Sequence, residues 1–118
     1  MSVDRSRRVN IDDVEFDDQL ALVNDVPFTG LVFVMCTNGQ LEAEYNYVEG
    51  LPSGIQRTWY PDGNLMEEWS AIRGRGSAWT REWYQEGTMK SERIYENGAL
   101  VRVREWGEDG QLLSDAIK

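Results

Sequence analysis

The chain has 118 residues, of which 41% are hydrophobic, and its formal net charge is −9. The length fits one domain, and the hydrophobic content excludes a disordered chain. The excess of acid disfavours nucleic acid as a ligand, because phosphate would be repelled, and it favours a basic protein as partner.

The first residues carry arginines, but no apolar stretch follows them, so we expect no signal peptide. No apolar run reaches the roughly 18 residues of a membrane helix, and we therefore expect no membrane span. The single cysteine, Cys36, cannot form an internal disulfide. Together these features predict a protein of the reducing cytoplasm.

Residues 1–25 are predicted to form an acidic lead-in segment, separate from the remainder of the chain. The acidic run at 12–18 is similar to a calcium loop, but the glycine that such a loop needs at its turn is missing. We expect this run to be solvated and strand-like, with Val14 and Phe16 turned inward. Its aspartates are Asp12, Asp13, Asp17 and Asp18.

A period of 24 residues begins at residue 30. Gly39, Gly63 and Gly87 are spaced by 24 residues, and Gly110 follows after 23. Each repeat predicts a β-hairpin, because its turn (TNG, PDG, QEG or EDG) lies between residues with high strand propensity. The repeats span residues 30–53, 54–77, 78–100 and 101–118. The chain is therefore predicted to be all-β, with an antiparallel meander over 26–118.

The turn type fixes the register of each hairpin. A bulged three-residue loop would set Trp59 opposite Leu65, and it would also pair Arg57–Glu67, Ile55–Trp69 and Glu82–Lys90. A two-residue Asp-Gly loop would instead match the charges of Arg57–Glu68, Arg81–Glu92 and Arg104–Asp115. We favour the bulged loop, because Pro61 has no N–H for the ladder that the tighter turn needs.

One column of the repeat is apolar in every block, and we expect it to form the main core. In the bulged register its side chains make a continuous row across the sheet, with strands roughly 4.8 Å apart. The alternative is an aromatic strip that binds sugars or bases. The row consists of Met35, Leu41, Trp59, Leu65, Trp83, Met89, Trp106 and Leu112.

The pattern G-x5-Y-P-D-G-x-L-x-x-E, followed by Y-x-N-G, resembles the bacterial variant of the MORN (membrane occupation and recognition nexus) repeat. The matching residues are 54–68 and 92–98, and the entry sequence at 26–30 is also typical of that family. Cys36 and Gly107 depart from the pattern, because they replace its tyrosine.

This resemblance covers about residues 26–118, and it implies a single curved antiparallel sheet. Similar bacterial proteins are often antitoxins, or immunity proteins against secreted toxins. The resemblance therefore implies a protein that neutralises a cognate toxin, by occlusion through its acidic surface. The alternative from another class is a structural or membrane-associated scaffold.

The sequence offers little catalytic chemistry. Histidine is absent, which removes the usual general base and the commonest metal ligand. Glu44 and Glu68 could supply a glycosidase-like carboxylate pair, but a flat sheet provides no pocket for a sugar. We therefore expect a protein that is not an enzyme and binds no cofactor and no metal.

The residues predicted to bind the partner come from the acidic first half, where residues 9–72 hold twelve acids and one base. The carboxylates would steer a basic toxin, and exposed aromatic residues would anchor it. The set is Asp12, Asp13, Asp17, Asp18, Glu42, Glu44, Tyr45, Tyr47, Glu68 and Trp69. The open edges of such a sheet could also pair two copies of the chain.

Overall fold

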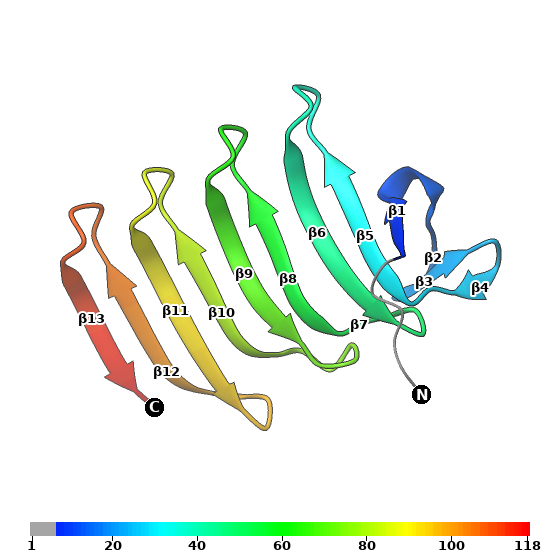
Figure 1. The fold of residues 1–118 in the computed structure, drawn as a ribbon. Coiled ribbons are helices and arrows are strands. Elements are labelled where there is room, and N and C mark those ends of the chain that lie inside the picture. Colours follow the sequence, from blue (N-terminus) through cyan, green and yellow to red (C-terminus); the bar gives the residue numbers. More distant parts are fainter. Residues whose placement is uncertain (1–6) are drawn as a thin grey trace.

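The computed structural model describes residues 7–118, which form an open β-sheet with a smaller sheet beside its N-terminal end (Figure 1). The larger sheet has the order β1-β5-β6-β8-β9-β10-β11-β12-β13, with β7 pairing β6, and the smaller sheet is β2-β3-β4. From β5 onward the strands are antiparallel. The predicted all-β meander is confirmed, and β1, which runs parallel to β5, is an addition to it.

The elements alternate strand and turn along nearly the whole described chain. One short 3-10 turn, η1, interrupts the N-terminal part. The bounds are β1 (Arg8–Asn10), η1 (Ile11–Asp13), β2 (Glu15–Asp17), β3 (Leu20–Val23), β4 (Val26–Pro27), β5 (Gly30–Met35), β6 (Leu41–Val48), β7 (Leu51–Pro52), β8 (Gly54–Trp59), β9 (Leu65–Ala71), β10 (Ser77–Trp83), β11 (Met89–Glu96), β12 (Ala99–Trp106) and β13 (Leu112–Ile117).

The hairpin turns are the bulged three-residue loops that the sequence predicts. In the second repeat, the Tyr60 N–H donates to the Asn64 carbonyl at 2.8 Å and the Gly63 N–H to the Tyr60 carbonyl at 2.9 Å. Gly63 has a φ of 94°, a left-handed conformation that glycine adopts without strain. The other three turns form the same two bonds, so the predicted turn type is confirmed.

A second bulge follows each turn and changes the register. Trp59 lies opposite Leu65 as predicted, but Met66 is then skipped, so Arg57 lies opposite Glu68. The same shift occurs in the other three hairpins. The charge pairs expected for the two-residue loop, such as Arg57–Glu68, therefore occur together with the bulged turn. The predicted pairings Arg57–Glu67, Ile55–Trp69 and Glu82–Lys90 are wrong, because they assume a regular ladder beyond the turn.

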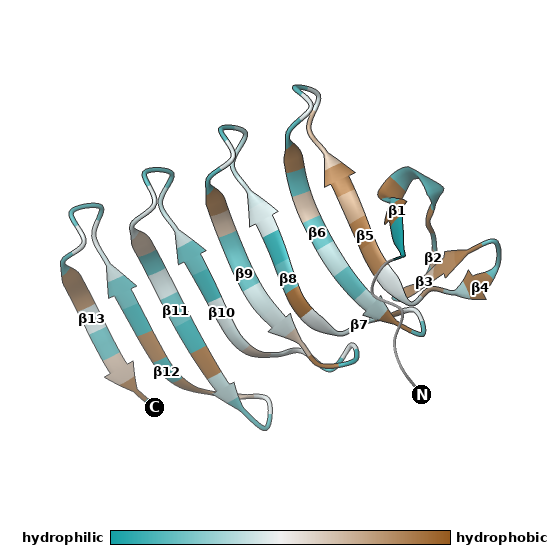
Figure 2. Cartoon of the chain, in the orientation of Figure 1, coloured by the Kyte–Doolittle hydropathy of each residue, from teal (hydrophilic) through white to brown (hydrophobic). Residues whose placement is uncertain are grey.

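The hydrophobic core lies at the N-terminal end, under the smaller sheet. Its fully buried members are Ala21, Phe28 and Val32, and Tyr47 is 9% exposed. Figure 2 shows the same concentration of hydrophobic residues over β3, β4 and β5. The apolar row from Met35 to Leu112, which we call the Trp row, was predicted to form the main core. That prediction is wrong, since none of its residues is buried.

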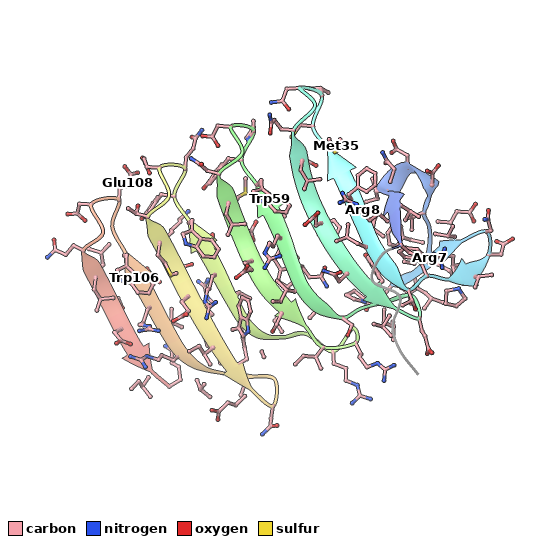
Figure 3. All side chains as sticks on the ribbon, viewed as in Figure 1. Arg7, Arg8, Met35, Trp59, Trp106 and Glu108 are labelled. Atoms are coloured by element: carbon pink, nitrogen blue, oxygen red, sulfur yellow. The ribbon has the colours of Figure 1, made fainter. Side chains whose placement is uncertain are left out.

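The Trp row lies on a sheet that has no second layer over most of its width. Met35 and Leu112, at the two ends of the row, are 44% and 48% exposed, and its tryptophans are only half-buried. Figure 3 shows Met35, Trp59 and Trp106 aligned near the hairpin turns. The radius of gyration is 16.0 Å, whereas a compact domain of this length has roughly 13 Å. This excess reflects the single-layer shape.

Tyrosines tie neighbouring repeats together near the turns. The Tyr60 hydroxyl donates to the Trp83 carbonyl at 2.8 Å, and the Tyr84 hydroxyl donates to the Trp106 carbonyl at the same distance. Cys36 occupies the equivalent position in the first repeat and has no hydroxyl. The first repeat therefore lacks the tie that joins the later ones.

The contact between the first and second repeats, which we call the seam, has fewer residue pairs than the other two contacts between repeats. Strands β6 and β8 share only two residue pairs, Ala43–Thr58 and Glu44–Arg57. Beyond them the Ser53 N–H donates to the Asn46 carbonyl at 2.9 Å, and the buried side chain of Gln56 takes the place of further backbone contacts. Its amide accepts from the N–H of Asn46 and donates to the carbonyl of Asn46 at 2.9 Å.

Candidate functional site

One face of the sheet carries a charge ladder, with one residue from each neighbouring strand. Register places these residues directly opposite one another, with acid and base alternating from β6 to β13. Opposite charges at facing positions stabilise a sheet. The charge ladder consists of Glu44, Arg57, Glu68, Arg81, Glu92, Arg104 and Asp115.

The carboxylates of the charge ladder are occupied by arginines. Glu68 accepts from Arg57 Nε at 2.7 Å and lies 3.8 Å from Arg81. Glu44 lies 3.9 Å from Arg8 of β1. A partner protein would have to displace these arginines in order to use Glu44 or Glu68. Both belong to the predicted partner-binding set, and the structure places them in this internal network.

Glu92 is the most buried member of the charge ladder, at 7% exposed. Its burial disfavours the charged form, but hydrogen bonds from Arg81 and Arg104 outweigh this effect and lower its pKa. Arg81 donates through Nε at 3.0 Å, and Arg104 donates from the other side. The centre of the charge ladder therefore stays ionised and holds β10, β11 and β12 in register.

An acidic groove lies between β6, β8 and β9, close to the first two hairpin turns. Tyr45 is adjacent to Glu44 in β6, and so it points to the face opposite the charge ladder. The groove has a volume of about 360 Å³. Its lining residues are Cys36, Glu42, Ala43, Tyr45, Thr58, Trp59, Pro61, Met66 and Glu67.

The acidic groove combines two carboxylates, Glu42 and Glu67, with the ring of Tyr45, and Trp69 lies beside it. The ring of Tyr45 lies 6.2 Å from the ring of Trp69, centroid to centroid, with the planes tilted by 54°. Burial raises the pKa of Tyr45, and the charges of Glu42 and Glu67 raise it further. Within residues 7–118, neither Glu42 nor Glu67 forms an ion pair. Their negative charge is therefore available to a ligand.

The structure divides the predicted partner-binding residues into separate groups. Glu42 and Tyr45 line the acidic groove, and Trp69 lies next to it, near the ring of Tyr45. Tyr47 is buried in the core and contacts Phe16 at a ring distance of 6.5 Å, so its prediction as an exposed anchor is wrong. The four aspartates are exposed, but they lie on η1, on β2 and at its following turn: Asp12, Asp13, Asp17 and Asp18.

The lead-in segment differs in part from its prediction. Residues 15–17 are a strand, as expected, and Val14 packs against the core. Phe16 is 48% exposed, so its predicted inward position is wrong. Residues 26 and 27, at the start of the predicted repeat region, form β4 of the smaller sheet.

Sequence reasoning missed Glu67 as a groove residue. The signal was present, because Glu67 is the acid at a repeat position where the other blocks carry Ala43, Ser91 and Ser114. The structure places each of these four residues at the same point after the second bulge. The departure of Glu67 from the repeat was thus a better indicator of the groove than membership of the repeat.

Among the described residues, no group of acidic or cysteine side chains could hold a metal ion. In that part of the chain, no helix has the length and apolar character to cross a membrane.

The fold and its charge ladder define a class of protein, an open β-sheet built from tandem hairpins. The family model described as MORN repeat variant matches residues 52–71, which include β8 and β9. The chain therefore contains a MORN repeat variant, which supports its interpretation as a MORN-type repeat protein. No curated protein and no solved structure matches the chain.

Proposed function

We propose that this protein is a non-enzymatic binding protein whose acidic groove receives a basic segment of a partner protein. The observation that carries the proposal is the combination of Glu42 and Glu67, both without an ion pair in the described chain, with the rings of Tyr45 and Trp69. Carboxylates steer a cationic partner, and aromatic residues commonly supply the buried anchors of an interface.

The acidic groove suits this role better than the charge ladder does. Removing Glu68 from its arginines would leave Arg57 without its carboxylate partner and Arg81 with Glu92 alone, which opposes binding. Glu42 and Glu67 lose no such partner when a lysine or arginine approaches them. A basic side chain would also lie against the ring of Tyr45 or Trp69, where a cation–π contact is favourable.

The more specific proposal is an antitoxin or immunity protein of a bacterial cytoplasm, which occludes a cognate toxin with a basic surface. The resemblance of residues 26–118 to MORN-variant proteins of that kind supports it. The net charge of −9 also supports it, because a strongly acidic body accelerates association with a cationic partner. Activity of the toxin would be blocked by coverage of its surface, without chemistry on the antitoxin.

Co-expression with the product of the neighbouring gene tests this function. The tagged protein is expected to co-purify with that product and to relieve its toxicity. The variant Glu42→Lys/Glu67→Lys is expected to lose both effects. The matched control is Glu86→Lys/Glu108→Lys, which makes the same charge change at exposed turns. Equal loss in both variants would refute the site, and absence of any complex with the wild type would refute the function.

A scaffold role remains as the second candidate, and the free edge of the sheet favours it. Strand β13 is the last strand, and its Leu113 and Ile117 are 67% and 78% exposed. Exposed edges of this kind pair readily with other strands. Concentration-dependent dimerisation in light scattering, or sedimentation with anionic liposomes at low salt, would support this role.

A further inference from the structure

A second cavity lies at the ends of the strands that are far from the hairpin turns. It is between the turn that joins β9 to β10 and the turn that joins β11 to β12. Its volume is about 450 Å³. The lining residues, which define the loop pocket, are Ile72, Arg75, Ser77, Ala78, Tyr95, Asn97 and Gly98. A neighbouring depression of about 290 Å³ shares four of them: Arg75, Ser77, Tyr95 and Gly98.

The loop pocket occurs where the repeat becomes irregular. Strands β6–β7 and β11–β12 are joined by two-residue turns, Glu49-Gly50 and Asn97-Gly98, with positive φ at both residues. The turn between β9 and β10 is longer, and the Ile72 N–H donates to the Gly76 carbonyl across it at 2.9 Å. The loop pocket therefore adjoins the one return turn, among these three, that departs from the tight form.

The corresponding space one repeat earlier is filled by the protein itself. There the Gly74 N–H donates to the Pro52 carbonyl at 3.0 Å, and Leu51 Cδ2 lies 3.5 Å from the position of a Cβ on Gly74. At Gly98, one repeat later, an added Cβ would meet nothing within 4 Å. The loop pocket is thus a space between neighbouring return turns that stays open, whereas the equivalent space one repeat earlier is filled.

The polar side chains that line the loop pocket can all donate hydrogen bonds. Arg75 presents a guanidinium, Ser77 and Tyr95 present hydroxyls, and Asn97 presents an amide. In the described part of the chain, Arg75 forms no ion pair, and no hydrogen-bond partner is found for the side chains of the other three. Arg73, in the same loop, adds a second positive charge that forms no ion pair within residues 7–118.

The acid nearest along the chain is Glu96, which precedes Asn97 but does not line the loop pocket. The wall of the loop pocket also includes apolar surface, since Ile72 is 48% exposed and Ala78 lies beside it. Pockets with mainly apolar walls and a few convergent polar groups are typical of small-molecule sites.

We infer that the loop pocket binds a small organic molecule with an oxyanionic head group, a phosphate or a carboxylate. The guanidinium of Arg75 provides the paired donors that such groups prefer. The hydroxyls of Ser77 and Tyr95 and the amide of Asn97 complete the donor set, and the body of the ligand lies against Ile72. This site is separate from the acidic groove and does not depend on the proposed partner.

The test is to titrate the full chain separately with phenyl phosphate, benzoate and inorganic phosphate at low salt. Amide chemical shifts in NMR spectra report the binding. Saturable shifts at residues 72–78 and 95–98 are expected with phenyl phosphate or benzoate. Comparison of these two probes decides between a phosphate and a carboxylate head group. Inorganic phosphate is expected to bind more weakly than phenyl phosphate, because it lacks a body to contact Ile72.

The variant Arg75→Gln is expected to weaken binding by about tenfold or more, the effect of losing hydrogen bonds to a charged group. The matched control is Lys90→Gln, which removes one positive charge from an exposed position outside the loop pocket. Its affinity is expected to equal that of the wild type. Equal weakening in the two variants, shifts located elsewhere, or no saturable binding of either organic probe would overturn the inference.

Discussion

Replacing Glu92 by glutamine tests whether the charge ladder stabilises the sheet. The carboxylate accepts from Arg81 at 3.0 Å and from Arg104, and the Glu92 residue is 7% exposed. Hydrogen bonds to charged groups contribute roughly 1.5–3 kcal/mol each. The two arginine side chains are 36% and 32% exposed, so solvent replaces part of what they lose. We therefore expect the free energy of unfolding to fall by about 2–3 kcal/mol.

Urea denaturation followed by tryptophan fluorescence measures this change. The midpoint is expected to fall by roughly 1–2 M for a protein of this size. The control is Asp115→Asn at the end of the charge ladder, where the pair with Arg102 is solvated and its loss is expected to be much smaller. If Glu92→Gln were no more harmful than this control, the central pairs would not stabilise the fold as argued.

Three further results are expected from stability measurements. Folding lowers the pKa of Glu92 below its ordinary value of 4.5, so the free energy of unfolding should fall as the pH drops below 4.5. The fall should be smaller in Glu92→Gln, which lacks this carboxyl group. Tyr84→Phe removes the bond to the Trp106 carbonyl and should cost about 1 kcal/mol in urea denaturation, whereas an unchanged midpoint would contradict its tying role. Gln56→Leu leaves the Asn46 N–H without its acceptor, while the Asn46 carbonyl keeps the Ser53 N–H, and should cost about 1–3 kcal/mol by the same assay; a neutral effect would contradict the bridge.

The hairpins could be predicted because their signals are local. Gly63 and Pro61 determine a turn type within a few residues, and the 24-residue period carries it to the other repeats. The second bulge could not be predicted from the turn alone. The bulged turn and the charge pairs implied different registers, and skipping one residue, Met66, satisfies both. The conflict between the two signals thus lies where the ladder is irregular.

The position of the core was harder to predict, because it depends on what covers the sheet. An apolar column describes one face of a strand, but it does not show whether a second layer exists. Phe28 and Ala21 lie outside the repeats, and they cover Val32 only after the smaller sheet folds back on β5 and β6. The same long-range contact buries Tyr47, which local sequence had marked as exposed.

The candidate site was predicted in part. Charge and aromatic content selected Glu42 and Tyr45, which line the acidic groove, and Trp69, which lies near the ring of Tyr45. The same criteria also selected Glu44 and Glu68, since the sequence does not reveal that arginines on neighbouring strands already bind them. The strand register decides which carboxylates pair with arginines, and the sequence did not determine the register.

The narrow seam has a consequence for how the chain opens. Only two residue pairs join β6 to β8, and side-chain hydrogen bonds of Gln56, Asn46 and Asn38 supplement them. Amide exchange should therefore separate the chain into two cooperative units, one before and one after residues 49–53. The acidic groove crosses this boundary, since Tyr45 belongs to one unit and Glu67 to the other. A bound partner would clamp the two units together and slow exchange on both sides.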